Sequence, residues 1–163
     1  MNAAAFFANR RLQVVVLFLV SFLLYANTLT HGFVLDDGIV ITENKAVRAG
    51  FSGLKVLFTK DSFFGFSGSS EAAHIVAGAR YRPLSLALFA VLYQFFGAQP
   101  FVFHLFTVLL YAGVVVLLYR TFALLLAPVW SEGTAAAAAF ATALLFAVHP
   151  VHTEVVANVK SCD

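Results

Sequence analysis

Two adjacent carboxylates lie where an apolar run gives way to a polar one. Asp36 and Asp37 follow the apolar residues of the sequence HGFVLDDG, at the edge of the first long hydrophobic segment. A carboxylate at such an edge can be a solvated loop charge, or it can lie at the lip of a membrane cavity. In a cavity it would accept a proton from a hydroxyl group or hold a cation. These residues by themselves leave both interpretations open.

An arginine precedes the proline that begins another apolar segment, in the sequence YRPL at positions 81–84. Proline favours the first turn of a helix, where unpaired N–H groups and the helix dipole attract anions. A guanidinium can also hold phosphate through two parallel hydrogen bonds. Arg82 therefore predicts either a phosphate site or an arginine that marks the membrane edge.

A third polar cluster, HPVHTE at positions 149–154, ends a further apolar segment. His149 and His152 could share a helical face and bind a metal. However, the HExxH pattern of many zinc sites is absent, and Pro150 disturbs a helix there. The pattern favours histidines that cap a helix and orient carboxylates. Lys160, which follows the cluster, is interpreted as an interfacial charge.

The composition indicates a membrane protein. Hydrophobic residues make up 61% of the chain and charged residues 11%, whereas soluble domains have about 45–50% and about 25%. A soluble domain of this size could not bury so much apolar surface, but lipid can cover it. The net charge of +2, without a basic stripe, argues against a nucleic-acid partner. The single cysteine, Cys162, excludes an intrachain disulfide.

The predicted fold is an all-α, polytopic membrane protein with four hydrophobic helices. These helices are expected over residues 12–29, 83–96, 101–126 and 134–148. Arg10 and Arg11 place residues 1–11 in the cytoplasm, so residues 30–82 form a large extracytoplasmic loop. In that loop, FSGLKVLFTK predicts a short amphipathic helix on the membrane surface, with Ser52 as its N-cap.

The side of the membrane on which residues 149–163 lie stays open. If every apolar segment crosses once, Asp36 and His149 lie on opposite sides. Residues 150–163 could instead return as a further helix, or residues 83–96 could be only partly inserted.

The chain resembles a known family of membrane enzymes. The order of YANTL, FVLDDGIVITEN, YRPLSLALFAVLY, FHLFTVLLY and LFAVHPVHTEVVANVKSCD is similar to the opening of the transmembrane and tetratricopeptide-repeat O-mannosyltransferases and of bacterial relatives. These enzymes belong to the GT-C glycosyltransferase superfamily. The resemblance implies that residues 1–163 are the N-terminal part of a GT-C domain, without its C-terminal helices and repeats.

The resemblance implies a reaction and its partners. A sugar, mannose-like by the resemblance, would pass from a polyprenyl-phosphate or dolichyl-phosphate carrier to a protein Ser or Thr hydroxyl, with inversion. Membrane lipid, the lipid-linked sugar and the protein acceptor are the implied partners, and nucleic acid is not among them. The site would be extracytoplasmic, in a bacterial inner membrane or the endoplasmic reticulum. The need for a divalent cation stays open.

Residue roles also follow from the resemblance. Asp36 would be the general base, and Asp37 its neighbour in the acceptor or metal site. Tyr81 and Arg82 would bind the carrier phosphate. The second acidic motif, with its supporting histidines, would comprise Glu154, Asp163, His149 and His152.

Two departures from the family pattern bear on activity. Cys162 stands where the family usually has an arginine before the last acid, and the chain ends at Asp163. We therefore expect these 163 residues alone not to catalyse transfer. The competing functions are a small transporter or channel subunit, with Asp36 and His149 handling ions, and an inactive membrane fragment. Ionisable groups at helix ends favour the enzyme over the transporter.

Overall fold

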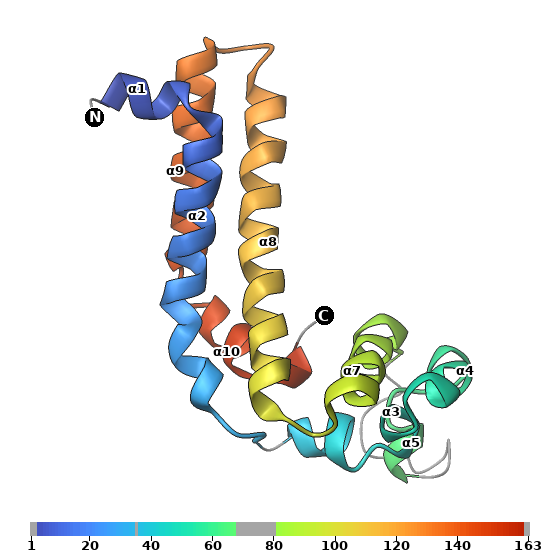
Figure 1. The fold of residues 1–163 in the computed structure, drawn as a ribbon. Coiled ribbons are helices and arrows are strands. Elements are labelled where there is room, and N and C mark those ends of the chain that lie inside the picture. Colours follow the sequence, from blue (N-terminus) through green and yellow to red (C-terminus); the bar gives the residue numbers. More distant parts are fainter. Residues whose placement is uncertain (1–2, 35, 68–80, 162–163) are drawn as a thin grey trace. The chain divides into compact units, whose positions relative to one another are not determined.

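All regular secondary structure is helical in the part of the chain that the computed structural model describes, residues 3–34, 36–67 and 81–161 (Figure 1). No strand occurs in these residues, so the predicted all-α class is confirmed. The chain forms two compact units. The first comprises Met1–Thr28 and Phe106–Thr153, and the second Leu29–Leu105 and Glu154–Asp163.

A short N-terminal helix and long helices build the first unit. They are α1 (Ala3–Ala8), α2 (Arg10–Tyr25), α8 (Pro100–Leu126) from Phe106 onward, and α9 (Glu132–Val148). A 3-10 turn over Ala26–Thr30 extends α2. Side chains cap two of these helices, because Asn9 accepts a hydrogen bond from the Leu12 amide and Ser131 accepts one from the Thr134 amide.

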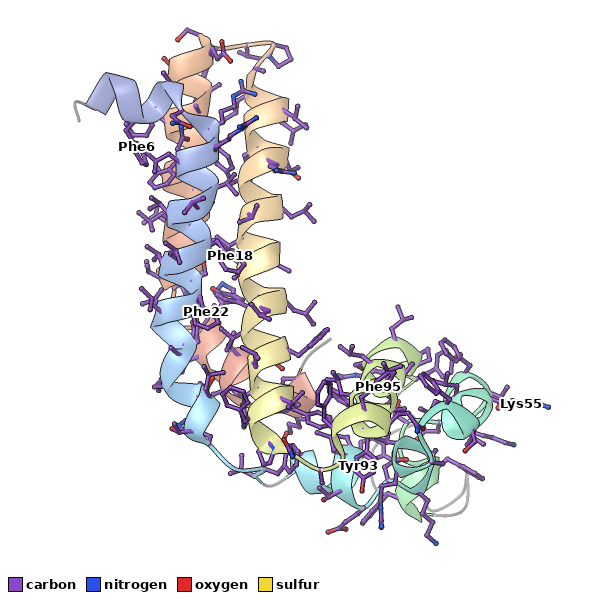
Figure 2. The ribbon with its side chains drawn as sticks, viewed as in Figure 1. Phe6, Phe18, Phe22, Lys55, Tyr93 and Phe95 are labelled. Carbon is purple, nitrogen blue, oxygen red and sulfur yellow. The ribbon has the colours of Figure 1, made fainter. Side chains whose placement is uncertain are left out.

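Rows of side chains four residues apart pack α2 against α9. The buried row on α9 consists of alanines, and the row on α2 mixes apolar and polar residues: Ala135, Ala139, Ala143 and Ala147, and Gln13, Leu17, Ser21 and Tyr25. Small residues let two helix backbones approach closely, as they do inside membranes. Phe6 of α1, which is labelled in Figure 2, packs edge-to-face on Phe140 in the middle of α9, with ring centroids 5.2 Å apart.

The directions of the long helices follow from contacts at their ends. Arg10 pairs with Glu132 at 2.9 Å, so α2 and α9 begin at the same end and run parallel. The Tyr119 hydroxyl of α8 donates to Gln13 at 2.9 Å, near the start of α2. Tyr111, earlier in α8, packs against Tyr25 at the end of α2, with ring centroids 5.1 Å apart. Helix α8 is therefore antiparallel to α2 and α9, as Figure 1 shows.

In the residues that the structure describes, two helices are long and apolar enough to cross a membrane, Arg10–Thr30 and Pro100–Leu126. Two apolar helices are shorter, α7 (Pro83–Phe96) and α9. When the 3-10 extension of α2 to Thr30 is included, all four lie within two residues of their predicted ranges. Two potential crossings are thus present by length and composition in the described residues, and the predicted four crossings are not confirmed.

The second unit consists of α7, the first turns of α8 and a set of short helices. The short elements are a π-helical turn over Gly38–Thr42, α3 (Lys45–Arg48), a 3-10 turn over Gly50–Gly53, α4 (Leu54–Thr59), α5 (Phe64–Ser67), most of α10 (His152–Ala157) and a 3-10 turn over Val159–Ser161. The segment predicted to be a loop with one surface helix is therefore largely helical where it is described. The hydrophobic core of the second unit includes Ile41, Val47, Leu57, Leu86, Phe89, Phe103 and Val159.

The predicted amphipathic helix exists as α4, but its start differs from the prediction. Ser52 is not the N-cap, because it lies in a 3-10 turn and its hydroxyl donates to the Ala49 carbonyl at 2.7 Å. Gly53 precedes α4 instead, and a Cβ there would come within 1.9 Å of the Ala46 carbonyl oxygen. Leu57 enters the core while Phe58 is exposed. Figure 2 shows Lys55 of α4 pointing away from α7.

Both ends of α7 contact the short helices before it. At its start, the Arg82 amide donates to the Ser62 hydroxyl at 2.9 Å. Near its end, Gln94 accepts a hydrogen bond from the Phe51 amide at 3.4 Å. Phe51 also packs on Phe95, with ring centroids 5.8 Å apart. Helix α7 therefore lies alongside these short helices over its whole length.

Candidate active site

A cavity of about 390 Å³ in the second unit brings together groups from three distant parts of the chain. Asp36 reaches it from the segment after α2, Arg82 from the start of α7, and Glu154 from α10. Hydroxyl and apolar side chains complete the wall: Ser62, Ser85, Ser161, Val40, Phe63, Leu86, Phe89 and Val155. Three of the residues predicted from the sequence thus line one cavity.

Asp36 is the more accessible member of the acidic pair. Its side chain is 51% exposed and forms an ion pair with the Lys160 ammonium, which is itself 35% exposed. Lys160 also lines the cavity. The cavity wall therefore carries two carboxylates, Asp36 and Glu154, and two cations, Arg82 and Lys160.

Asp37 is fully buried, and backbone amides occupy both of its carboxylate oxygens. Oδ2 accepts from the Val34 amide at 3.2 Å, and Oδ1 accepts from the Lys160 amide at 2.8 Å. Buried carboxylates are stable only when they are paired or hydrogen-bonded in this way. Asp37 thus ties the segment after α2 to the segment after α10 and positions Asp36 beside Lys160.

A chain of polar contacts fixes the backbone at Arg82. The Ser62 hydroxyl accepts from the Arg82 amide, and the Ser62 carbonyl accepts from the Asn44 side chain at 3.2 Å. Buried Asn44 also caps α3, because its oxygen accepts from the Ala46 and Val47 amides. Sequence reasoning missed Asn44 and Ser62, since no local spacing connects positions 44, 62 and 82.

The N-terminal end of α7 forms part of the cavity. Pro83 begins the helix, and Ser85 and Leu86 of its first turn line the wall. The positive end of the helix dipole and the Arg82 guanidinium therefore both favour an anion here. The nearby apolar side chains suit a ligand that combines an anionic group with hydrocarbon.

Two other predicted residues lie elsewhere or outside the described chain. Tyr81 is exposed and does not line the cavity, and its hydroxyl donates to the Phe58 carbonyl at 2.7 Å. Asp163 lies outside the described residues. The roles proposed for them from the family pattern stay predictions.

His149 and His152 belong to the first unit, where their contacts are with aromatic rings and backbone. His149 accepts a hydrogen bond from the Val151 amide at 3.2 Å, and the His152 ring lies 4.2 Å from that of Phe146. Burial, and secondarily the neighbouring His149, lower the pKa of His152 below its ordinary value. His152 is therefore neutral at neutral pH. Among the described residues, no group of three potential metal ligands occurs.

Lys160 is the functional candidate that the sequence interpretation missed. It is 124 positions from Asp36, so no helical or strand periodicity connects them. The available signal was its place between Glu154 and Asp163, as the one cation within an acidic motif.

Comparison with known proteins identifies similar chains. Human protein O-mannosyl-transferase TMTC4 is 37% identical over 147 residues, covering 86% of this chain and 19% of that protein. Mouse protein O-mannosyl-transferase TMTC3 is 36% identical over 135 residues, covering 83% and 13%. Protein O-mannosyl-transferase Tmtc2 of Drosophila melanogaster is 37% identical over 140 residues, covering 85% and 14%. No family model matches the chain, and no solved structure matches it significantly.

Proposed function

The chain is homologous over most of its length to the TMTC protein O-mannosyl-transferases, as its motifs predicted, and from this premise we propose that its cavity is the transfer site of a glycosyltransferase. The chain spans less than a fifth of the length of these relatives, so the activity of the whole enzyme is part of the proposal. The observation that carries it is the shared cavity of Asp36, Arg82 and Glu154.

The proposed donor is a sugar, mannose-like, on a polyprenyl-phosphate carrier, and the acceptor is a protein Ser or Thr hydroxyl. Asp36 accepts the hydroxyl proton as that oxygen attacks the anomeric carbon from the side opposite the phosphate. The bond between that carbon and the phosphate oxygen breaks, and the configuration inverts. Arg82 and the start of α7 stabilise the negative charge that develops on the departing phosphate. Glu154 adds a second carboxylate, which favours positive charge on the sugar ring.

The hydrocarbon carrier requires a site at the membrane edge. The proposal therefore depends on which helices cross the membrane and on whether α7 is one of them. Asp36 and Glu154 line one cavity, so both segments lie on one side of the membrane. Helices α8 and α9 intervene between them and run antiparallel, which gives two crossings and returns the chain to the same side. A further crossing by α7 would separate Asp36 from Glu154. We therefore place α7 beside the membrane and assign three crossings, to α2, α8 and α9.

Helix lengths and charges support this topology. The 14 residues of α7 span about 21 Å and the 17 residues of α9 about 26 Å, against a hydrocarbon thickness of ~30 Å. Arg10, Arg11 and Arg120 line one hollow of the first unit, at the end where α2 and α9 begin. Clustered arginines favour the cytoplasmic side. Residues 30–99 and 149–161 are then extracytoplasmic.

Cysteine accessibility tests the three crossings. In a Cys162→Ser background, single cysteines replacing Lys55, Gln99 and Val151 should react with a membrane-impermeant maleimide in intact cells or sealed right-side-out vesicles. A cysteine replacing Val129, between α8 and α9, should react only after permeabilisation. Position 99 is decisive, because it follows α7. Protection at 99 together with labelling at 55 would mean that α7 crosses the membrane.

A transfer assay tests the proposed reaction. Because these 163 residues alone are not expected to catalyse transfer, membranes containing the whole product of the gene are supplied with polyprenyl-phosphate mannose and a Ser/Thr-rich peptide. Sugar on the peptide is measured by mass spectrometry. We expect transfer above membranes without the protein, and the α-linkage or β-linkage of the product should be opposite to that of the donor. Retention of the donor configuration would contradict the single displacement, and absence of transfer with every polyprenyl-phosphate sugar would contradict the proposed function.

A further inference from the structure

We propose that Lys160 is a second phosphate-binding cation of this site and that it exchanges partners, leaving Asp36 for the phosphate of the lipid carrier. The inference rests on the proposed function, because the carrier phosphate is the anion it assigns to Lys160. In the structure the Lys160 ammonium is paired with Asp36. When the carrier phosphate binds, Lys160 pairs with it, and the Asp36 carboxylate is released to receive the acceptor hydroxyl.

The first argument comes from the difference between the two acidic neighbours. Asp37 is buried and bound by two backbone amides, so it holds its place. Asp36 and Lys160 are held together by side-chain atoms that remain 51% and 35% exposed. Ion pairs that water reaches contribute little net stability. The Asp36–Lys160 pair is therefore the contact that an incoming anion can replace.

The second argument concerns how Lys160 is anchored. Its backbone amide donates to Asp37 at 2.8 Å, which fixes its main chain beside the acidic pair. Its side chain is a flexible four-carbon stem with a compact charge, which can change partner without movement of the backbone. Lys160 and Arg82 both line the cavity, so a phosphate bound between them would replace Asp36 as the anion nearest to Lys160.

The third argument concerns charge during transfer. A carrier phosphate linked to a sugar has one negative charge, and the departing carrier phosphate gains a second as the sugar leaves. One cation neutralises the single charge of the donor phosphate, whereas two cations are needed to neutralise the two charges of the departing phosphate. Lys160 should therefore matter more for the free carrier phosphate and for the rate of transfer than for initial donor binding.

Binding of polyprenyl phosphate in lipid nanodiscs tests the inference directly. We compare the wild-type protein with Lys160→Gln, Lys160→Arg and Lys55→Gln, using polyprenyl phosphate and uncharged polyprenol as probes. Lys160→Gln should weaken binding of the phosphate about tenfold, the size expected for one charge-assisted hydrogen bond. Lys160→Arg should restore most of the affinity. Lys55 of α4 points away from α7, so Lys55→Gln should bind as the wild type does. Polyprenol binding should be equal in all four proteins.

The outcomes separate this inference from the proposed function. Phosphate binding that depends on Arg82 but is unchanged in Lys160→Gln would overturn the inference and leave the function standing. Binding of polyprenyl phosphate no tighter than that of polyprenol in the wild type would overturn both. Binding that depends on Lys160, in a protein that transfers no sugar, would support the assignment of Lys160 and contradict the function. All variants keep the backbone amide that binds Asp37, and the unfolding temperature of each variant is measured to check that it is folded.

Discussion

Replacement of Asp36 by asparagine should lower the turnover rate of sugar transfer by about 10²–10⁴-fold, the usual contribution of a general base. Asparagine has nearly the same shape as aspartate but cannot accept the hydroxyl proton. Binding of polyprenyl phosphate should not weaken, because the change frees the Lys160 ammonium from its ion pair. Initial rates at saturating donor and acceptor, together with the dissociation constant of polyprenyl phosphate, measure the two effects separately.

Two carboxyl-to-amide replacements serve as controls. Glu43 is exposed and does not line the cavity, so Glu43→Gln should transfer sugar at the wild-type rate. Asp37→Asn should lower the free energy of unfolding. In the wild type both carboxylate oxygens accept from backbone N–H groups, and the amide nitrogen of asparagine would leave one of these N–H groups without an acceptor. A buried donor or acceptor left without a partner costs about 1–3 kcal/mol, which thermal unfolding detects. Near-normal turnover by Asp36→Asn would contradict the assignment and transfer the base role to Glu154.

The long helices could be predicted from the sequence because their signal is local. An unbroken apolar run fixes the existence of a helix such as α7 or α8, and Pro83 marks the start of α7. Apart from α4, which the pattern of FSGLKVLFTK predicted, the short helices between residues 38 and 67 carry no such signal. They have four to six residues each, too few to be stable alone, and depend on packing against α7.

The candidate site was predictable where chemistry coincides with the end of an apolar segment. Asp36, Arg82 and Glu154 each stand at such a point, and the structure brings all three to one cavity. The partnership of Lys160 with Asp36 was not predictable, because it joins positions far apart in the chain.

The different surroundings of Asp36 and Asp37 were also hidden in the sequence. Both residues lie in a helical turn, where successive side chains point about 100° apart. One therefore reaches the cavity while the other is buried against backbone amides. Two adjacent aspartates in a sequence do not indicate which carboxylate lines the cavity and which is buried.

Replacement of Arg82 by alanine should weaken binding of polyprenyl phosphate by about 10–150-fold, which corresponds to the ~1.5–3 kcal/mol of a hydrogen bond to a charged group. Lysine at this position keeps the charge but loses the planar, two-pronged geometry, so Arg82→Lys should fall between alanine and the wild type. The backbone contact of Arg82 with Ser62 survives both replacements, because it uses the main-chain N–H group. Dissociation constants measured in nanodiscs, with uncharged polyprenol as the reference ligand, give the contribution of the phosphate alone.

The matched control for Arg82 is Arg48, an exposed arginine in the last turn of α3 that does not line the cavity. Arg48→Ala removes the same charge from the same unit, so any general effect of net charge on anion binding appears in both variants. The additional loss of affinity in Arg82→Ala, beyond that in Arg48→Ala, then measures the contribution of the Arg82 side chain in the cavity. Because the start of α7 also attracts the anion, Arg82→Ala should retain weak preference for phosphate over polyprenol. Equal affinities of the wild type, Arg82→Lys and Arg82→Ala would make Arg82 an interfacial anchor and remove the phosphate from this end of α7.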